Sequence, residues 1–393
     1  MSSDTIGLYV HIPFCTAKCG YCDFNSYAGH EHLIPSYAET LVKDAALWRS
    51  AVRGRRVATV FFGGGTPSLN PLEEMATILE GLRAAFDVAP DAEVTLEANP
   101  GGLTADYLRG LRTLGFNRLS IGVQSFDDEE LVVLDRRHTA EDAREAYRAA
   151  RAAGFENVNL DLIYGLPEQP LSSWQRSLEE AIALGPEHLS LYALTVEEGT
   201  PLARDVARGR TAAPDPDMQA EHYEWTQDRL AAAGYEHYEI SNWCRPGCRC
   251  EHNLVYWRSG EYLGLGAGAH SHLNGVRFST ALLPNRYAEL VDETVAAGDG
   301  TMRHVVGGER VTETLAMADA LILGLRLTDG VSAEEFARRH GRSVDDVYGE
   351  VLAEFESYGI VERTPTHLRL TRRGRLLSNE LFQRLLPEPA PAG

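Results

Sequence analysis

Three cysteines near the start of the sequence carry the clearest chemical signal. Cys15, Cys19 and Cys22 fall within eight residues and follow directly after a predicted strand. Three thiolates at this spacing can bind three irons of a 4Fe–4S cluster and leave the fourth iron open. The alternative is a zinc site, which needs four ligands and would have to recruit His11 or His30. Because no fourth cysteine follows locally, the spacing favours the cluster.

A glycine-rich turn follows the second predicted strand. Its sequence is Phe61-Phe62-Gly63-Gly64-Gly65-Thr66-Pro67. Glycines allow the backbone to approach a ligand closely, although the same turn is equally typical of a tight strand-to-helix connection. The expected position beside the cysteine loop favours a ligand-binding turn.

Polar side chains are also expected at the carboxyl ends of successive strands. Glu97 and Gln124 end two strands, Asp161 lies within a third, and Arg136 could reach the same rim. A carboxylate or amide inside an apolar strand is costly unless it has a partner. Each residue alone could be a satisfied polar group in the core, but together they predict one shared site at this edge.

Alternating strands and helices must position these residues. Apolar, β-rich runs predict strands at Gly7–Ile12, Val57–Phe62, Glu93–Glu97, Arg118–Val123, Val158–Ile163 and His188–Leu194. Helical periodicity lies between them at Tyr37–Val52, Leu72–Phe86, Ala105–Leu114, Ala140–Ala153 and Ser172–Leu184. Six strand–helix units in series predict an α/β fold with a parallel sheet, closed into a partial (β/α)6 barrel.

The remainder of the chain is expected to form smaller units after a core at residues 1–240. A further helix over Met218–Ala233 and one strand over Tyr235–Asn242 end that core. Residues 241–305 are rich in glycine and aromatic residues with little helical periodicity, which predicts a connecting segment. Residues 306–386 predict three helices, a hairpin and a last helix over Arg373–Leu386, a small winged-helix-like α+β module. Residues 387–393 form a Pro/Ala-rich tail.

The composition limits the classes of partner. Among 393 residues, 37 are Lys or Arg and 57 are Asp or Glu, for a net charge of −20. This charge argues against nucleic-acid binding, which requires cations that displace counterions. No stretch of about 20 apolar residues predicts a membrane span, and the first residues lack the features of a secretory signal. We therefore expect a cytoplasmic protein.

The cysteine and glycine patterns together resemble a known superfamily. Tyr9-x-His11-x-Pro13-Phe14-Cys15-x3-Cys19-x2-Cys22, followed by Gly63-Gly64-Gly65-Thr66-Pro67, is similar to the radical S-adenosylmethionine (SAM) superfamily, and more narrowly to the anaerobic coproporphyrinogen III oxidase group. The resemblance implies a 4Fe–4S cluster on Cys15, Cys19 and Cys22, with SAM on the free iron. The positions that match SAM contacts in the group are Tyr9, Gly64, Gly65, Thr66, Glu97, Gln124, Arg136 and Asp161.

The resemblance also implies a role for each part of this set. The Gly64–Thr66 turn would take up the methionine end of SAM, and Glu97 and Arg136 would pair with its charged groups. Asp161 or Gln124 would bind the ribose hydroxyls. The reduced cluster would pass an electron to the sulfonium, while the protein positions the cofactors and excludes water.

Two departures point to a subgroup. The oxidases carry a further cysteine where Phe24 stands, and a long N-terminal segment that is not expected before Tyr9. Instead, His252-Asn253-Leu254-Val255-Tyr256-Trp257 is similar to the His-Asn-x-x-Tyr-Trp signature of related heme chaperones. The resemblance implies heme as a ligand of His252, Tyr256 and Trp257, and an acceptor protein of unknown identity to receive it.

Alternatives remain open at this point. Without the resemblance, a buried core histidine is the favoured interpretation of His252; His270 and Cys250 are alternate axial ligands, and the Gly260–Gly268 run could close over a heme. Cys244, Cys248 and Cys250 could hold metal or heme, although buried small side chains are favoured for Cys244 and Cys248. The function alternatives are a coproporphyrinogen III oxidase, another radical-SAM enzyme acting on tetrapyrroles, and an acidic interaction protein with a vestigial site.

Overall fold

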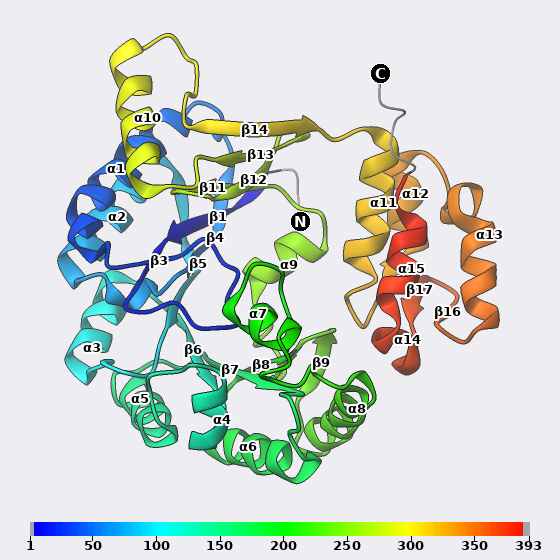
Figure 1. Cartoon of the computed structure of the whole chain (residues 1–393). Helices are drawn as coiled ribbons and strands as arrows, with labels where there is room; N and C mark the ends of the chain where they lie inside the picture. Colours follow the sequence, from blue (N-terminus) through cyan, green and yellow to red (C-terminus); the bar gives the residue numbers. More distant parts are fainter. Residues whose placement is uncertain (1–3, 388–393) are drawn as a thin grey trace.

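A curved sheet forms the framework of the molecule (Figure 1). The structure, a computed structural model, describes residues 4–387, and within them twelve strands form one mixed sheet. Its central strands are parallel neighbours in the order β1-β4-β5-β6-β7-β8. Their bounds are Thr5–Ile12, Arg56–Gly64, Asp87–Ala98, Arg118–Gln124, Val158–Tyr164 and His188–Ala193. The predicted six-stranded parallel core of a partial barrel is confirmed.

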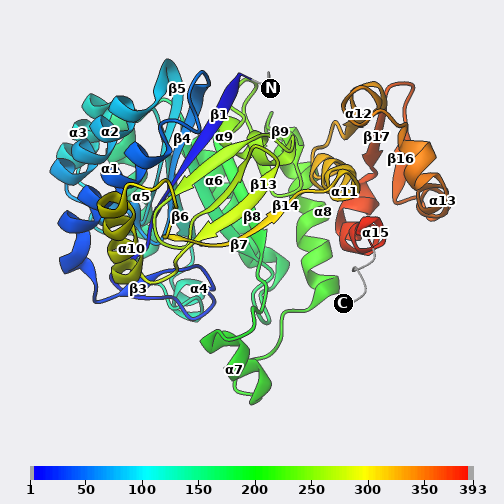
Figure 2. The same cartoon turned by 90° about the horizontal axis from the view of Figure 1, so that it is seen from above.

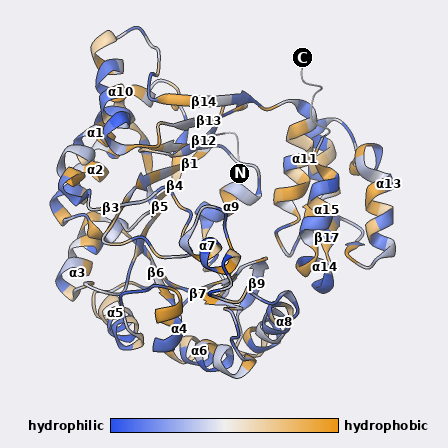
Figure 3. Ribbon diagram, in the orientation of Figure 1, coloured by the Kyte–Doolittle hydropathy of each residue, from blue (hydrophilic) through white to orange (hydrophobic). Residues whose placement is uncertain are grey.

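Helices cover the outer side of this parallel core (Figures 1 and 2). They are α1 (Ile34–Trp48), α2 (Leu72–Ala85), α3 (Ala105–Leu114), α5 (Ala140–Ala152), α6 (Leu171–Leu184) and α8 (Pro216–Ala232). Hydrophilic and hydrophobic bands alternate along these helices (Figure 3), as expected when one face packs on a sheet. The buried strand and helix side chains form one continuous core.

The segment from 236 to 310 differs from the prediction. The single strand expected over Tyr235–Asn242 is instead an antiparallel pair, β9 (Glu236–Glu239) and β10 (Asn242–Cys244). The connecting segment is not irregular: β11 pairs parallel with β1, and β12, β13 and β14 extend that edge antiparallel. Its elements are α9 (Glu251–Trp257), β11 (Tyr262–Leu265), β12 (His270–Leu273), β13 (Val276–Thr280), α10 (Pro284–Ala297) and β14 (Val305–Arg310).

A smaller module with its own hydrophobic core follows β14 and lies beside the open side of the barrel (Figure 1). Its elements are α11 (Glu313–Gly324), β15 (Val331–Ser332), α12 (Ala333–His340), α13 (Val344–Ser357), β16 (Val361–Arg363), β17 (His367–Leu370), α14 (Arg372–Leu376) and α15 (Ser378–Leu385). The expected last helix is broken at Leu377 into α14 and α15. The predicted tail lies outside the described residues, apart from residue 387.

The two ends of the parallel strands carry different elements (Figure 2). At the carboxyl ends lie β2 (Phe14–Cys15), β3 (Tyr27–Ala28), α4 (Asp128–Val133) and α7 (Pro201–Ala207). At the amino ends lies α9, which packs against β1, β4 and α11. Among the helices of residues 4–387, none has the length and apolar character that crossing a membrane requires.

Candidate functional site

The cysteine loop lies at the carboxyl end of β1. Cys15 ends β2, Cys19 and Cys22 follow in the loop, and all three thiols are free and partly exposed. Thr66 Oγ1 lies 3.5 Å from the sulfur of Cys15, and Arg136 Nη1 lies 3.5 Å from the sulfur of Cys19. Burial raises the pKa of Cys22, and the neighbouring Cys19 and Cys15 add to this shift. The predicted cluster ligands therefore share one site with two other predicted residues.

The zinc alternative receives no support from this geometry. Within residues 4–387, no three His, Cys, Asp or Glu side chains converge as ligands of a single metal ion. His11, one proposed fourth ligand, has both ring nitrogens occupied: Nε2 is 2.8 Å from the carbonyl oxygen of Asn25, and Nδ1 is 3.0 Å from the hydroxyl of Tyr9. A 4Fe–4S cluster binds each thiolate through a different iron, so the thiolates need not converge on one point.

The glycine turn packs directly against the cysteine loop. Gly64 has φ of 112°, and a Cβ there would lie 2.4 Å from the His11 ring. A Cβ on Gly65 would lie 2.6 Å from the carbonyl oxygen of Phe14 and 2.9 Å from that of Ile12. Only glycine fits at these two positions, because the backbone of the turn touches the strand that leads into Cys15.

Two acidic residues face the interior of the barrel near this turn. Glu97 accepts a hydrogen bond from the Gly64 N–H at 3.2 Å, and Asp161 accepts from Ser120 and Asn159. Burial, together with the nearby carboxylate of Asp161, raises the pKa of Glu97 to about 7. Burial also raises the pKa of Asp161. Glu97 can therefore hold or release a proton near neutral pH.

Arg136 reaches the same rim through Asn99. Its Nη2 donates to Asn99 Oδ1 at 2.6 Å and to the carbonyl of Gly122 at 2.8 Å, while Asn99 Nδ2 donates to Thr66 Oγ1 at 3.0 Å. Among the described residues, Arg136 Nε is buried without a partner. The sequence analysis missed Asn99, although its position two residues after Glu97 places it on the same side of the chain.

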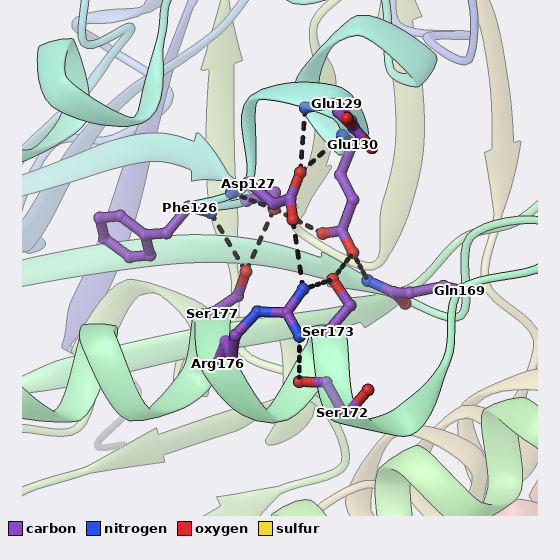
Figure 4. A network of polar contacts seen from close by, with 10 residues as sticks. Phe126, Asp127, Glu129, Glu130, Gln169, Ser172, Ser173, Arg176 and Ser177 are labelled. Atoms are coloured by element: carbon purple, nitrogen blue, oxygen red, sulfur yellow. Dashed lines mark hydrogen bonds and ion pairs between the residues drawn. The ribbon is translucent and has the colours of Figure 1, made fainter.

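A buried carboxylate holds the segment that carries Arg136 (Figure 4). Glu130 on α4 accepts from Ser173 at 2.6 Å, from Gln169 at 2.9 Å and from Ser125 at 2.6 Å. A buried charge is stable only with partners of this kind. The network ties α4 to the start of α6. The backbone N–H of Arg136 in turn donates to the carbonyl oxygen of Leu131 on α4, so the position of Arg136 depends on this helix.

The two other residues matched to SAM lie at the same end. Gln124 is a non-glycine residue with φ of 66°, at the irregularity where β6 leaves its register with β7. Such a conformation costs about 1–3 kcal/mol and is common at ligand sites. The Tyr9 ring stacks on Phe61 with centroids 6.3 Å apart, and its hydroxyl contacts His11. The structure thus brings the eight predicted SAM residues and the three cysteines together.

His252 enters the barrel from α9 at the amino ends of the strands, with its ring centroid 5.1 Å from that of Phe61 and 6.5 Å from that of Tyr9, and it has no free ring nitrogen. Nδ1 hydrogen-bonds with Thr59 Oγ1 and Nε2 with the hydroxyl of Tyr256, each at 2.8 Å, and the residue is 1% exposed. Burial lowers the pKa of His252 to about 3, with a contribution from Arg118. Binding iron through His252 would require one of these hydrogen bonds to break.

The alternate heme ligands differ in accessibility. Cys250 is fully buried, with its sulfur 3.6 Å from Glu93 Oε1, whereas His270 is exposed. The predicted closing loop over Gly260–Gly268 is β11 and the tight turn after it. Trp257 packs under the guanidinium of Arg326, 4.4 Å from the ring centroid. Of these residues, His270 lies nearest to the cysteine loop, since its charge contributes to lowering the pKa of His11.

The chain is similar to known proteins over nearly its whole length. The radical SAM superfamily profile matches residues 9–181, and the HemN C-terminal domain profile matches residues 311–377. The heme chaperone HemW of Mycobacterium tuberculosis is 39% identical over 389 residues, covering 98% of this chain and 96% of that protein. The chain belongs to the HemW family.

Other relatives of the family agree with this assignment. The heme chaperone HemW of Bacillus subtilis is 35% identical over 381 residues, covering 97% of this chain and 99% of that protein. The structure of coproporphyrinogen III oxidase (HemN) from Escherichia coli, a radical SAM enzyme, superposes with a TM-score of 0.84 at 25% identity, covering 97% of this chain and 90% of that chain. The resemblance inferred from the motifs is therefore confirmed, and the oxidase alternative is less supported than the HemW family.

Residues outside the shared motifs also have defined places in this HemW family member. Phe24, which replaces the extra cysteine of the oxidases, is 64% exposed beside the cysteine loop. Cys244 and Cys250 are buried, and burial raises the pKa of each to about 12. Cys248 packs against the small cluster that contains Cys244. Neutral thiols packed in this way agree with the interpretation of small buried side chains.

Proposed function

We propose that this chain carries heme and passes it to an acceptor protein. The observation that supports this proposal is its similarity, over nearly the full length of both chains, to HemW proteins named as heme chaperones. The net charge of −20 agrees with a protein partner rather than nucleic acid.

The carboxyl end of the barrel would hold the resident cofactors. Cys15, Cys19 and Cys22 would bind a 4Fe–4S cluster, and SAM would lie against the Gly64–Thr66 turn. When bound, this cluster supplies an electron to the sulfonium of SAM. The fit of the chain rests on its own groups: partly exposed thiols, a turn where only glycine fits, and a buried guanidinium nitrogen without a partner.

The charged residues of this end have separable tasks. Arg136 donates toward the sulfur of Cys19, so it would lie beside the bound cluster and orient this ligand. Its unpartnered Nε is free to donate to a carboxylate of SAM. Glu97 lies at the Gly64 N–H and can accept from an amino group once it has lost its proton. Asp161 and Gln124 would bind the ribose hydroxyls, and the Tyr9 ring would close the interior side.

The N–H groups of the glycine turn have another task. Gly65 donates to the carbonyl of Ile12 at 2.8 Å, and Thr66 donates to that of Phe14 at 2.7 Å. These groups hold the turn to the cysteine loop and are not free for a ligand. Contact with SAM would therefore use the carbonyl oxygens of the turn or the close approach that its missing side chains allow.

A titration with hemin tests the carrier function. The full chain with reconstituted cluster should bind about one hemin per chain and release the same unmodified porphyrin to an excess of apomyoglobin, read from the Soret absorption and from chromatography of the extracted pigment. Absence of hemin binding would contradict the proposal. Sustained conversion of coproporphyrinogen III in the presence of SAM and a reductant would instead favour the oxidase alternative.

A further inference from the structure

A large cleft separates the amino end of the barrel from the C-terminal module. Its volume is about 1410 Å³, which exceeds the roughly 300–1,000 Å³ of ordinary small-molecule sites. One wall is formed by the end of α9 and the start of β11, and the other by α11 and α12. Figure 1 shows α9 beside α11, and these two helices contact one another where the barrel meets the module. The cleft lies at the opposite end of the parallel strands from the cysteine loop.

The walls offer the surfaces that a flat tetrapyrrole with carboxylate substituents requires. Trp257 from the barrel and Leu323 from the module supply aromatic and apolar surface. Five arginines line the cleft against four carboxylates, although the whole chain is strongly acidic. Among the described residues, the exposed Arg258 has no ion-pair partner. Arginine is the residue that best binds carboxylates such as heme propionates.

Arg339 joins the two walls. Its Nη1 donates to the carbonyl of Arg258 at 3.2 Å, and its Nη2 donates to the carbonyl of Ser259 at 2.9 Å. This contact sets the spacing between α12 of the module and the end of α9. The Arg339 guanidinium is therefore held at the backbone of residues 258 and 259, and both Arg258 and Arg339 line the cleft.

His272 has the hydrogen-bond state of an iron-binding histidine. Its Nδ1 lies 3.3 Å from the carbonyl oxygen of Gly260, so Nδ1 must carry the proton, because a carbonyl only accepts. Within residues 4–387, no group hydrogen-bonds with its Nε2, which therefore presents a lone pair. Metal-binding histidines commonly donate through one nitrogen to a carbonyl and bind the metal through the other.

The other histidines of the cleft are less suited to this role. His340 Nε2 is enclosed, and burial lowers the pKa of the ring. His367 is held through Nδ1 by its neighbour Thr366 at 2.9 Å, on the β17 side of the module. His272 is thus the cleft histidine with an accessible Nε2 and a fixed tautomer.

The His-Asn-x-x-Tyr-Trp motif leads to the same wall. His252 Nε2 hydrogen-bonds with the Tyr256 hydroxyl, and the Tyr256 ring packs edge-on against Tyr262, with centroids 4.6 Å apart. Tyr262 is the cross-strand partner of His272. The buried histidine of the motif therefore fixes a tyrosine that supports the strand pair carrying His272.

We propose that heme occupies this cleft, with Nε2 of His272 as axial ligand and Arg258 and Arg339 at the propionates. In this site His252 is a positioning residue that acts through Tyr256. The inference rests on the proposed heme-carrying function and adds the place and the ligand.

Three single variants of the full chain, tested with hemin, separate the possibilities. We expect His272→Ala to weaken hemin binding by at least tenfold and to remove the histidine-ligated signature of ferric heme in electron paramagnetic resonance, a signal to which an oxidised 4Fe–4S cluster does not contribute. Added imidazole should restore that signature in His272→Ala, because it can fill the space of the missing ring. The matched control is His367→Ala, which should retain both the affinity and the signature.

The third variant, His252→Ala, distinguishes a ligand from a positioning residue. We expect it to weaken hemin binding but to keep the histidine-ligated signature. The assignment would be overturned if His272→Ala kept the histidine-ligated signature. It would also be overturned if only His252→Ala lost the signature and imidazole restored it in that variant. If the wild-type chain binds no hemin, the proposed function itself fails; if it binds hemin and only the His272 result is contrary, the carrier function stands and the cleft site does not. Iron and sulfide content of each variant reports that it is folded.

Discussion

The residues around the glycine turn and those around His252 differ in how completely their polar groups are paired. At the carboxyl end, free thiols, an unpartnered guanidinium nitrogen and a strained Gln124 surround the glycine turn. At the amino end, the polar atoms of His252 are satisfied by Thr59 and Tyr256 inside the protein. Unpaired groups cost stability unless a ligand completes them, whereas a satisfied buried group only holds its neighbours in place. The comparison assigns ligand contact to the first set and positioning to the second.

The largest effect should come from removing the thiols of the carboxyl end. We expect the Cys15→Ala, Cys19→Ala, Cys22→Ala triple variant to lose its iron and sulfide entirely after anaerobic reconstitution, because no other thiolates lie in that loop. Hemin affinity should stay within twofold of the wild type. The control is the Cys244→Ala, Cys248→Ala double variant, which should keep its iron. A collapse of hemin affinity in the triple variant would break the separation between the two ends.

The next effect concerns the proton on Glu97. The folded chain raises the pKa of this carboxyl from 4.5 to about 7, so the folded state holds a proton that the unfolded state releases. Stability is therefore lost as the pH rises from 4.5 to 7, by about 3 kcal/mol from this group. Glu97→Gln should remove that loss, so its free energy of unfolding relative to the wild type should rise by about 3 kcal/mol between pH 4.5 and pH 8.

Urea denaturation of the cofactor-free chain at the two pH values measures this difference. Glu198→Gln, at an exposed position, is the control and should give the same small difference at both. If the difference in free energy of unfolding between Glu97→Gln and the wild type did not change with pH, Glu97 would be ionised in the folded chain as an ordinary carboxyl is. That result would weaken the contrast between the two ends.

The smallest effect should come from crowding the glycine turn. Gly65→Ala places a Cβ against the carbonyl oxygens of Phe14 and Ile12, and backbone atoms must shift to admit it. Overpacking of this kind costs about 2 kcal/mol, so we expect a lower Tm by circular dichroism and a lower iron content, with hemin affinity unchanged. Gly101→Ala, where a Cβ would meet nothing within 4 Å, is the matched control. Equal Tm values in the two variants would count against a tightly packed turn.

Much of the parallel core could be predicted, because its strands are apolar runs and its helices have one apolar face. The bounds of α3 agree with the prediction at both ends. The strands after residue 240 were missed, since β11 and β12 are four residues each and are interrupted by glycines and histidines. β11 becomes a strand by pairing with β1, more than 250 residues away in the sequence, and β12 by pairing with β11. Local periodicity does not contain the contact with β1.

The candidate site shows the same limit at single residues. Residues at the ends of predicted parallel strands could be placed together, because these ends meet at one edge of a sheet. Asn99 could have been found from its spacing to Glu97. The burial of His252 was one of its two interpretations from the sequence, but its partner Thr59 could not be predicted, because it lies 193 residues away in the sequence. A histidine in a motif predicts importance but does not distinguish ligand from support.

The length of β1 has a consequence for the porphyrin itself. This strand of eight residues runs from the cleft at Thr5 to the loop that follows Ile12, which separates the two sites by roughly 25 Å. Reacting atoms must approach to about 3–3.5 Å before bonds are made or broken. A heme in the cleft would thus lie too far away to react with any reactive species formed beside Cys15. On the proposed function, a barrel similar to that of coproporphyrinogen III oxidase would therefore carry its heme unmodified.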